Sequence, residues 1–367
     1  MILDKITNDQ KVHWLQIFAI LGFLAASFYA PKLWITTKDF PVIPMFDWLW
    51  IPKNPVDKYI AWFFLSLLGL QIFIKNRILG LSSVAIYIYL AFVDQNRLQP
   101  YFYQSILTLF AIHIFPKKTD SKLVLQAVAL IFFATYFWSG IHKINEIFYN
   151  QWMHALLKHF SFIPKVLLKI FTYMVPHLEW LMGVLLLFNK TRKFAIISVA
   201  VMHSIIVIVL FYLGYGFNVV PWNLQNILSV FVLFWSLKTT NFHEIFTEKL
   251  QLQKLVIIGF TIMLPFSNIF GYWDHLLSYS FFTSKLKYYY IQINDKQLEE
   301  KLPDNIKKYY RPHDGKVIIY ANEWAGEINR VLFYPQDRVI HYLDNYIKNF
   351  SEKEDKENLT TLVVYNR

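Results

Sequence analysis

The chain contains no cysteine among its 367 residues. This absence excludes a disulfide framework, thiol catalysis, a thiolate metal site and haem attached through thioether links. Charged residues are also scarce, at 17%. Hydrophobic residues make up 56% and aromatic residues 19%, with a mean hydropathy of +0.34, which excludes an ordinary soluble domain of this length. The composition therefore predicts a polytopic membrane protein.

The formal net charge of +11 does not indicate a nucleic-acid partner. Residues 285–367 hold 14 Lys and Arg against 13 Asp and Glu, which leaves 22 against 12 in residues 1–284. The excess lies in short loops between apolar runs, where the positive-inside rule expects it. The predicted surroundings are a lipid bilayer, and we expect neither a nucleic acid nor a metal ion as a partner.

Apolar runs predict an all-α polytopic bundle of about nine spans in residues 1–284. The runs lie at about 12–30, 58–75, 78–94, 101–115, 123–142, 174–189, 194–213, 224–238 and 254–273. The first run ends in Phe28-Tyr29-Ala30. A signal peptidase requires small residues there, so we predict a retained span and not a cleaved signal.

Orientation follows from the charges of the short loops. Basic residues fall in alternate loops, at Lys75 and Arg77, at Lys117, Lys118 and Lys122, and at Lys190, Arg192 and Lys193. The turn at 214–223, which follows the last of these loops, carries no charge. Nine spans then place the N-terminus in the cytoplasm and the C-terminus outside, in a bacterial cytoplasmic (inner) membrane.

Two connections are longer than turns. Residues 31–57 are rich in proline and tryptophan, which predicts an irregular interfacial segment anchored by indoles at the outer face. Residues 146–173 alternate apolar stretches with Lys158, Lys165 and Lys169, as an amphipathic helix in the interface does.

Residues 285–367 have the composition of a small soluble α+β domain. Strands are predicted at 287–293, 316–322 and 361–365, and helices at 297–309 and 337–350. The segment 311–315 is predicted to be a turn. On the topology above, the domain lies outside, where it can bind a protein partner.

The candidate site centres on the end of the fifth run. Gly140 and Lys143 share a helix face, so the missing side chain leaves room for a pocket beside the amine, and His142 adds an imidazole. Glu179 and His203 lie within later runs, where an ionisable group needs a partner. The alternatives are an interfacial anchor for Lys143, a structural ion pair for Glu179, and a neutral, hydrogen-bonded core histidine for His203.

The uncharged turn at 214–223 is predicted to lie on the same side as Lys143. Asn218 and Asn223 can donate and accept hydrogen bonds, and Trp222 offers a flat wall, so the turn can line a site for an apolar ring-shaped ligand. An ordinary interfacial turn has the same composition. Lys143, paired with Glu179, would stay charged, whereas desolvation would make it a base.

At these residues the chain resembles the horizontally transferred transmembrane domain family, the bacterial relatives of vitamin K-dependent γ-glutamyl carboxylase. The resemblance covers roughly 120–240: Tyr136-Phe137 followed by Gly140 and Lys143, then Glu179, then His203. It implies a lysine base at Lys143 that deprotonates a quinol, a quinone pocket near His203, and an outer C-terminal domain. A weaker similarity extends to DoxX-like redox membrane proteins.

Two functions from different classes follow. The first is a γ-carboxylase-like membrane enzyme in which Lys143, with Glu179 and His142, acts on a quinol or another lipophilic substrate. The second is a non-catalytic membrane subunit or docking platform whose outer domain binds a partner. A transporter is the third alternative.

Overall fold

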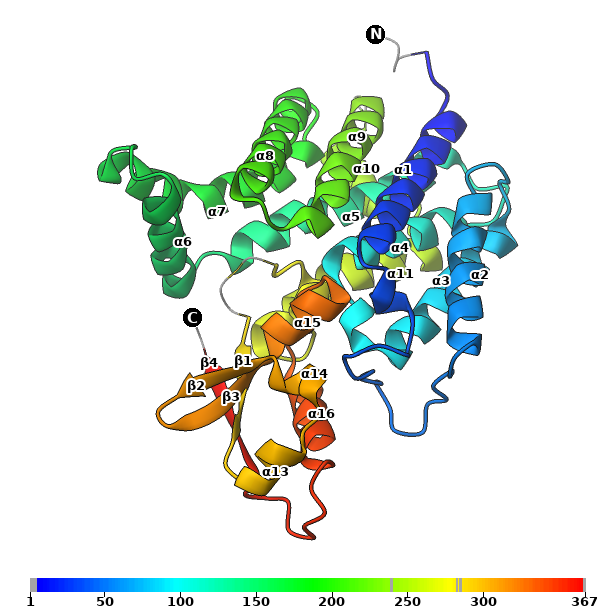
Figure 1. Ribbon diagram of the computed structural model, residues 1–367. Helices are drawn as coiled ribbons and strands as arrows, with labels where there is room; N and C mark the ends of the chain where they lie inside the picture. Colours follow the sequence, from blue (N-terminus) through cyan, green and yellow to red (C-terminus); the bar gives the residue numbers. More distant parts are fainter. Residues whose placement is uncertain (1–4, 238–239, 282, 284–285, 366–367) are drawn as a thin grey trace. The chain divides into compact units, whose positions relative to one another are not determined.

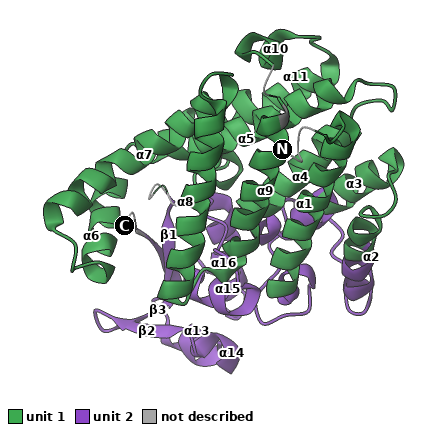
Figure 2. Ribbon diagram, turned by 90° about the horizontal axis from the view of Figure 1, so that it is seen from above, with its two compact units in different colours: residues 1–29, 64–87, 100–285 green, residues 30–63, 88–99, 286–367 purple. Residues whose placement is uncertain are grey.

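The computed structural model describes residues 5–237, 240–281, 283 and 286–365. The chain forms two compact units, which Figure 2 shows in different colours. The bundle unit takes in residues 1–29, 64–87 and 100–285. The composite unit takes in residues 30–63, 88–99 and 286–367, so the predicted C-terminal domain folds together with two distant segments.

Helices dominate the chain up to residue 270 (Figure 1). They are α1 (Asn8–Tyr29), α2 (Val56–Leu70), α3 (Arg77–Val93), α4 (Pro100–His113), α5 (Ser121–His142), α6 (Glu146–His159), α7 (Lys165–Leu187), α8 (Arg192–Leu213), α9 (Val220–Ser236), α10 (Phe242–Thr247), α11 (Leu252–Ile258) and α12 (Leu264–Ser267). A π-turn at Gly259–Met263 joins α11 to α12.

Six helical stretches of the described chain are long and apolar enough to cross a membrane. They are α1, α5, α7, α8, Phe217–Trp235 and Leu252–Phe270. The chain is therefore an integral membrane protein, but length and hydropathy do not confirm nine spans. The other three predicted spans correspond to α2, α3 and α4, which have 15, 17 and 14 residues and fall short of the 20 or so that a bilayer core requires.

The central helix of the bundle unit is α5. Its N-terminus is capped by the Asp120 side chain, which accepts from Lys122 N, and the following residues are almost uniformly apolar. Of its most apolar 18-residue window, 83% is buried, against 28% for α8. A helix that is apolar all round is stable when other helices enclose it, so α5 is the core on which the neighbouring helices pack.

Basic residues at several helix ends bind backbone carbonyls. The buried Arg192 guanidinium donates to Leu186 O and Leu187 O of α7 and to Leu237 O after α9. Arg77 likewise donates to His113 O and Ile114 O at the end of α4. The last carbonyls of a helix lack intrahelical donors and carry its negative dipole end, so a cation there stabilises the helix terminus.

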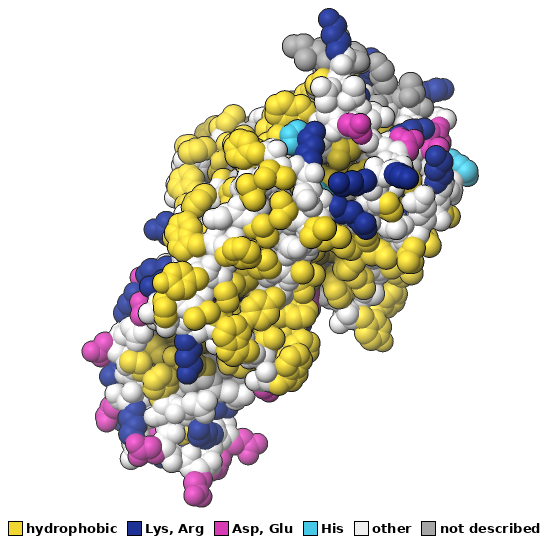
Figure 3. Space-filling model, turned by 90° about the vertical axis from the view of Figure 1, so that its right-hand side faces the viewer, with side chains coloured by type: hydrophobic (Ala, Val, Ile, Leu, Met, Phe, Trp, Pro, Cys, Tyr) yellow, Lys and Arg dark blue, Asp and Glu magenta, His cyan; other side chains and the backbone are white. Residues whose placement is uncertain are grey.

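Exposed side chains of the bundle helices are largely apolar. On α8 they recur every three or four residues, at Phe194, Ile197, Val201, Ile205 and Ile208. Figure 3 shows hydrophobic side chains over a broad area of one face of the molecule. Exposed apolar surface of this extent belongs in lipid and not in water.

The two interfacial segments fold differently from the prediction. The segment at 146–173 forms α6 and, after a break at 160–164, the first turns of α7. The Tyr149 ring of α6 is tilted against the Tyr173 ring of α7, with the ring centroids 4.5 Å apart. The span predicted at 174–189 is therefore the second half of a 23-residue helix, with α6 packed beside its first half.

The C-terminal part of the composite unit is a four-stranded antiparallel sheet in the order β2-β3-β1-β4. The strands are β1 (Tyr288–Ile293), β2 (Tyr310–His313), β3 (Lys316–Tyr320) and β4 (Thr360–Tyr365), and the helices are α13 (Lys296–Lys301), α14 (Asp304–Lys307), α15 (Ala321–Asn329) and α16 (Asp337–Lys348). This is the split β-α-β arrangement. Three predicted strands are confirmed, β2 was missed as a turn, and the helix α15 begins where the second predicted strand was to end.

The composite unit is joined through residues 94–99, which link α3 to α4. All six residues are at most 7% exposed. Asp94 pairs with the Lys38 amine at 2.7 Å, and Asn96 Oδ1 accepts from Tyr334 N. Burial lowers the pKa of Lys38, although the nearby Asp94 acts to raise it. Polar side chains thus satisfy one another across three parts of the chain.

The segment at 31–57 belongs to this unit and is not simply an interfacial cap. Trp324 Nε1 of α15 donates to Asp39 O at 2.8 Å, and the Phe40 ring lies 4.8 Å from the Trp324 ring. Asp57 accepts from Thr36 N at 2.9 Å. Its indoles behave as predicted only in part: Trp48 and Trp50 are exposed, whereas Trp34 is buried.

Candidate functional site

Helices α5 and α7 meet at two glycines. A Cβ added to Gly140 would lie 2.3 Å from Trp180 N and 2.7 Å from Pro176 O, and one added to Gly183 would lie 2.9 Å from Phe137 N. Such distances require that each glycine let the opposite backbone approach, as small residues do between membrane helices. The expected pocket beside Gly140 is therefore wrong, because the backbone of α7 occupies that space.

This close crossing brings Lys143 and Glu179 together, as expected from their placement in an apolar bundle. Lys143 follows the last residue of α5, and its Nζ lies 2.5 Å from Glu179 Oε2 and 2.8 Å from Ser139 Oγ. The two charged side chains are 10% and 12% exposed. The two side chains therefore form an ion pair that is largely shielded from solvent.

A second polar chain crosses from α5 to α8 and α9. Tyr136 Oη and His203 Nε2 are 3.0 Å apart, and His203 Nδ1 lies 2.7 Å from Asn223 Oδ1. Asn223 Nδ2 donates to Val219 O, which leaves its oxygen as the acceptor. This assigns the Nδ1–H tautomer to His203, with Nε2 accepting from the tyrosine. Lys143 and Glu179 both lie within Coulombic range of His203.

His142 and Lys143 are adjacent in sequence but face different neighbours. His142 is 2% exposed, and its ring stacks at 5.8 Å on Trp138. Trp138 Nε1 in turn donates to Thr261 O in the π-turn. The His142 imidazole therefore packs against Trp138, on the side of α5 that faces Thr261, whereas the Lys143 amine contacts Glu179 of α7.

Two residues of the predicted lining face α4. Trp222 Nε1 donates to Gln104 Oε1 at 2.6 Å, and Asn218 Nδ2 donates to Tyr101 Oη at 3.4 Å. Only Asn223 of this turn reaches the candidate site, through His203. The expected convergence of the whole turn on Lys143 is thus replaced by two clusters that share α9.

The second cluster contains polar residues that the sequence analysis overlooked. Gln104 Nε2 donates to Asn226 Oδ1 at 2.8 Å, and Ser105 Oγ donates to Gln225 Oε1 at 3.0 Å. The signal was the spacing: polar groups stand at i, i+3, i+4 and i+7 on both helices, which places each set on one face. The sets are Tyr101, Gln104, Ser105 and Thr108 on α4 and Trp222, Gln225, Asn226 and Ser229 on α9.

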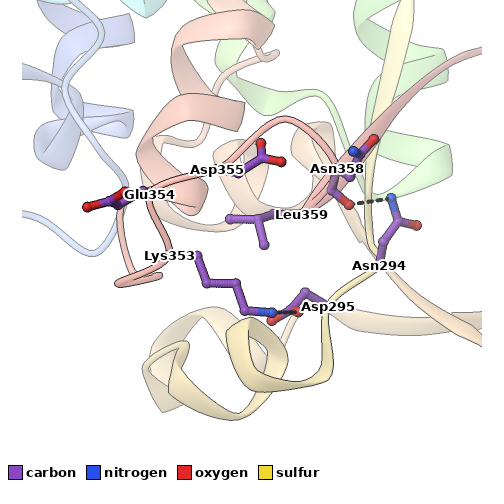
Figure 4. Close-up of a pocket in the computed structure, with 7 residues that line it drawn as sticks. All are labelled: Asn294, Asp295, Lys353, Glu354, Asp355, Asn358 and Leu359. Carbon is purple, nitrogen blue, oxygen red and sulfur yellow. Dashed lines mark hydrogen bonds and ion pairs between the residues drawn. The ribbon is translucent and has the colours of Figure 1, made fainter.

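A shallow groove in the composite unit carries no comparable chemistry. Figure 4 shows its lining, in which Lys353 reaches Asp295 and Asn294 lies beside Asn358. The ion pair between Lys353 and Asp295 neutralises the two charges that converge there. The candidate site therefore lies in the bundle unit.

Comparison with known proteins corrects the family resemblance. A family model described as methylamine utilisation protein MauE, a membrane protein family, matches residues 121–235. The sequence motifs suggested the horizontally transferred transmembrane domain family and, more weakly, the DoxX family, but neither family model matches the chain. No curated protein and no solved structure matches the chain. The matched segment runs from the start of α5 almost to the end of α9, and Lys143, Glu179, His203 and Asn223 all lie within it.

Proposed function

We propose that the α5–α9 core is a proton-exchange site for a lipid-soluble substrate of the quinol class. The observation that carries the proposal is the buried set of titratable groups: the Lys143–Glu179 pair lies within Coulombic range of His203, which is bonded to Tyr136. Ionisable groups within a membrane bundle are costly and commonly functional. A quinol hydroxyl is a weak acid that can enter from lipid and requires a proton acceptor.

The geometry changes the roles that the sequence indicated. In this proposal Lys143 acts as the ammonium, because its amine donates to Glu179 and Ser139 and offers no lone pair for a proton. Glu179 is then the acceptor: the quinol O–H bond breaks, the proton moves to the carboxylate, and the substrate becomes the anion beside the Lys143 ammonium. His203 and Tyr136 offer a second station for the proton.

The test uses purified protein in nanodiscs and a panel of benzoquinols and naphthoquinols. We expect at least one of them to raise the thermal unfolding temperature of the wild type. Glu179→Gln retains the shape but loses the acceptor, so the ligand-induced shift should disappear. Lys143→Arg retains a cation and should retain the shift. Equal stabilisation of the Glu179→Gln variant, or none of the wild type by any quinol, would refute the proposal.

A non-catalytic docking platform is the competing function, favoured by the composite unit. Three separate chain segments build this unit around the buried residues 94–99, which is more structure than a simple tail requires. In that function the Lys143–Glu179 pair is structural. Exchanging the two residues, in the variant Lys143→Glu with Glu179→Lys, would then restore the stability that either single change removes, and no quinol would alter it.

We further propose that α2, α3 and α4 complete nine membrane crossings. The segments after α1 and α3 pack into one unit with the C-terminal sheet, whereas Ser121 at the start of α5 bonds Asp9 at the start of α1. These contacts support a crossing by each of the short helices. At 1.5 Å per residue α4 spans roughly 21 Å, which a tilted or locally thinned bilayer accommodates.

Single cysteines test this topology without interference, because the chain has none of its own. Glu354 and Lys118 are both exposed. In intact spheroplasts an impermeant maleimide should label Glu354→Cys and should label Lys118→Cys only after lysis. Labelling of both before lysis would contradict the nine-crossing arrangement. Ser351, also in the C-terminal domain, is 8% exposed and is unsuitable as a labelling position.

The similarity to the methylamine utilisation family supports a shared membrane core. Its model covers fewer than a third of the residues of this chain, and α1–α4 and the composite unit lie outside it. We infer a common arrangement of α5–α9 for the chain. A role in methylamine utilisation is the family's, and growth of a deletion strain on methylamine would test whether it extends to this protein.

A further inference from the structure

Part of the linker between the last membrane helix and β1 is buried in the bundle unit. Its described residues from 276 to 283 are at most 8% exposed, and the Tyr279 ring lies 6.1 Å from that of Tyr103 on α4. The backbone is irregular, with Tyr279 at φ 58°, in the left-handed region. An amino acid with a bulky side chain adopts that conformation only where its surroundings fix it. These linker residues are therefore packed into the bundle unit and do not form a flexible connection.

Asn145 fastens this linker to the end of α5. Its Nδ2 donates to His142 O at 2.9 Å and to Thr283 O at 3.0 Å. Its Oδ1 accepts from Phe148 N at 2.9 Å and caps the N-terminus of α6. One amide therefore joins three elements, and both of its donors and its acceptor are used.

The position of Asn145 bears directly on the candidate site. Lys143 lies two residues earlier, and its carbonyl accepts from Asn145 N at 2.9 Å. Past the end of α5, the backbone N–H of Lys143 bonds Gly140 O and Ile141 O. The side chain of Asn145 adds a further constraint on this end of the helix, because it donates to the last α5 carbonyl, that of His142, and also to the linker at Thr283.

We propose that Asn145 is a positioning residue that couples the linker to Lys143 and so keeps the ammonium on Glu179. This positioning role does not depend on the proposed function.

Substitution by aspartate separates the two tasks of Asn145. Asn145→Asp retains an acceptor oxygen for the α6 cap, a position where Asp is favoured, but loses both donors. Asn145→Ser is a second variant that retains a cap acceptor and is too short to bridge both carbonyls. The matched control is Asn76→Asp, because Asn76 caps α3 through Oδ1, which accepts from Ile78 N at 2.8 Å.

The readout is the rate at which an amine-reactive ester acylates Lys143 in the full-length protein in nanodiscs, followed by mass spectrometry. Glu179→Gln, which removes the charged partner, sets the upper limit. We expect Asn145→Asp and Asn145→Ser to raise the rate at least threefold towards that limit, while Asn76→Asp stays at the wild-type rate. Thermal unfolding is recorded for each variant to confirm that it is folded.

A wild-type acylation rate in both Asn145 variants would overturn the positioning role. The experiment needs no substrate, so it is independent of the quinol test. If acylation rises as expected while no quinol stabilises the wild type, the coupling stands and the proton-exchange function falls. If quinols bind and acylation is unchanged, the function stands and the coupling falls.

Discussion

The crossing of α5 and α7 gives the sharpest prediction, because backbone atoms leave no room at Gly140. In Gly140→Ala the new methyl group would meet Trp180 N at 2.3 Å and Pro176 O at 2.7 Å, whereas ordinary contacts begin near 3.4 Å. A side chain could rotate away, but a helix backbone cannot. The two helices must therefore separate by about 1 Å at this point.

Such a separation has two costs. Overpacking in a tight core costs about 1–3 kcal/mol, and the upper half of that range applies here because the obstacles are backbone atoms. Lys143 lies one turn from Gly140, so its 2.5 Å contact with Glu179 lengthens towards the limit of a hydrogen bond. We expect Gly140→Ala to lower the free energy of unfolding by about 3 kcal/mol and the unfolding temperature by roughly 5–10 °C.

Gly69→Ala is the matched control, because Gly69 also lies in an apolar helix but has no atom within 4 Å of an added Cβ. Alanine is favoured over glycine in a helix by about 0.5–1 kcal/mol, so this variant should unfold at or above the wild-type temperature. The assay is thermal unfolding in one detergent, followed by intrinsic tryptophan fluorescence. If Gly140→Ala unfolds at the same temperature as Gly69→Ala, the close crossing does not exist in the folded protein.

Two further predictions concern buried polar contacts. Asp94→Asn should destabilise the composite unit by about 3–5 kcal/mol, because it leaves the buried Lys38 ammonium without its carboxylate. The double variant Asp94→Asn with Lys38→Met should recover most of the lost stability, measured as resistance to limited proteolysis. A double variant as sensitive to the protease as Asp94→Asn alone would contradict the prediction. Gln104→Leu removes two hydrogen bonds to α9 and should cost about 1–2 kcal/mol in thermal unfolding. Thr108→Val, which removes only a bond within α4, should cost less.

The sequence was a good guide to elements that local chemistry determines. Apolar runs located the membrane helices, and the 3.6-residue spacing located α16, whose buried residues include Val339, Ile340 and Leu343. Of the hairpin of β2 and β3, the turn and β3 were predicted, but β2 was not. Asp314-Gly315 has the two positive φ values that a type I′ turn requires, and Asp-Gly is a strong signal for that turn.

Contacts between distant residues could not be predicted in this way. The hydrogen bond from Trp324 to Asp39 joins positions 285 residues apart. No local pattern in the segment at 31–57 predicts that it packs with the C-terminal domain. Span length had the same weakness. Local hydropathy predicts apolar runs, but α2 and α4 are shorter than a bilayer core and are placed by their neighbours.

The ion pair of the site was predicted, because a buried charge needs an opposite charge as its partner. The hydrogen bonds between α4 and α9 were missed, because uncharged polar side chains can bond several different partners. A lysine and a glutamate near one end of an apolar bundle must find each other, and they do. Hydroxyl and amide side chains are less constrained, because each can bond its own helix, as Thr108 does with Gln104 O. Their spacing places one polar face on α4 and another on α9, a signal that was overlooked, and spacing alone does not show that the two faces meet.

The matched segment holds the candidate site but not everything that supports it. Within residues 121–235, Trp222 and Asn226 bond Gln104 of α4, and Asn145 bonds the linker at Thr283. Both partners lie outside the segment that the family model matches. A core of this kind can keep its ion pair and histidine while the flanking helices and linker change. Substitutions in α4 or in the linker are therefore expected to alter how α9 and Lys143 are positioned while leaving the titratable groups in place.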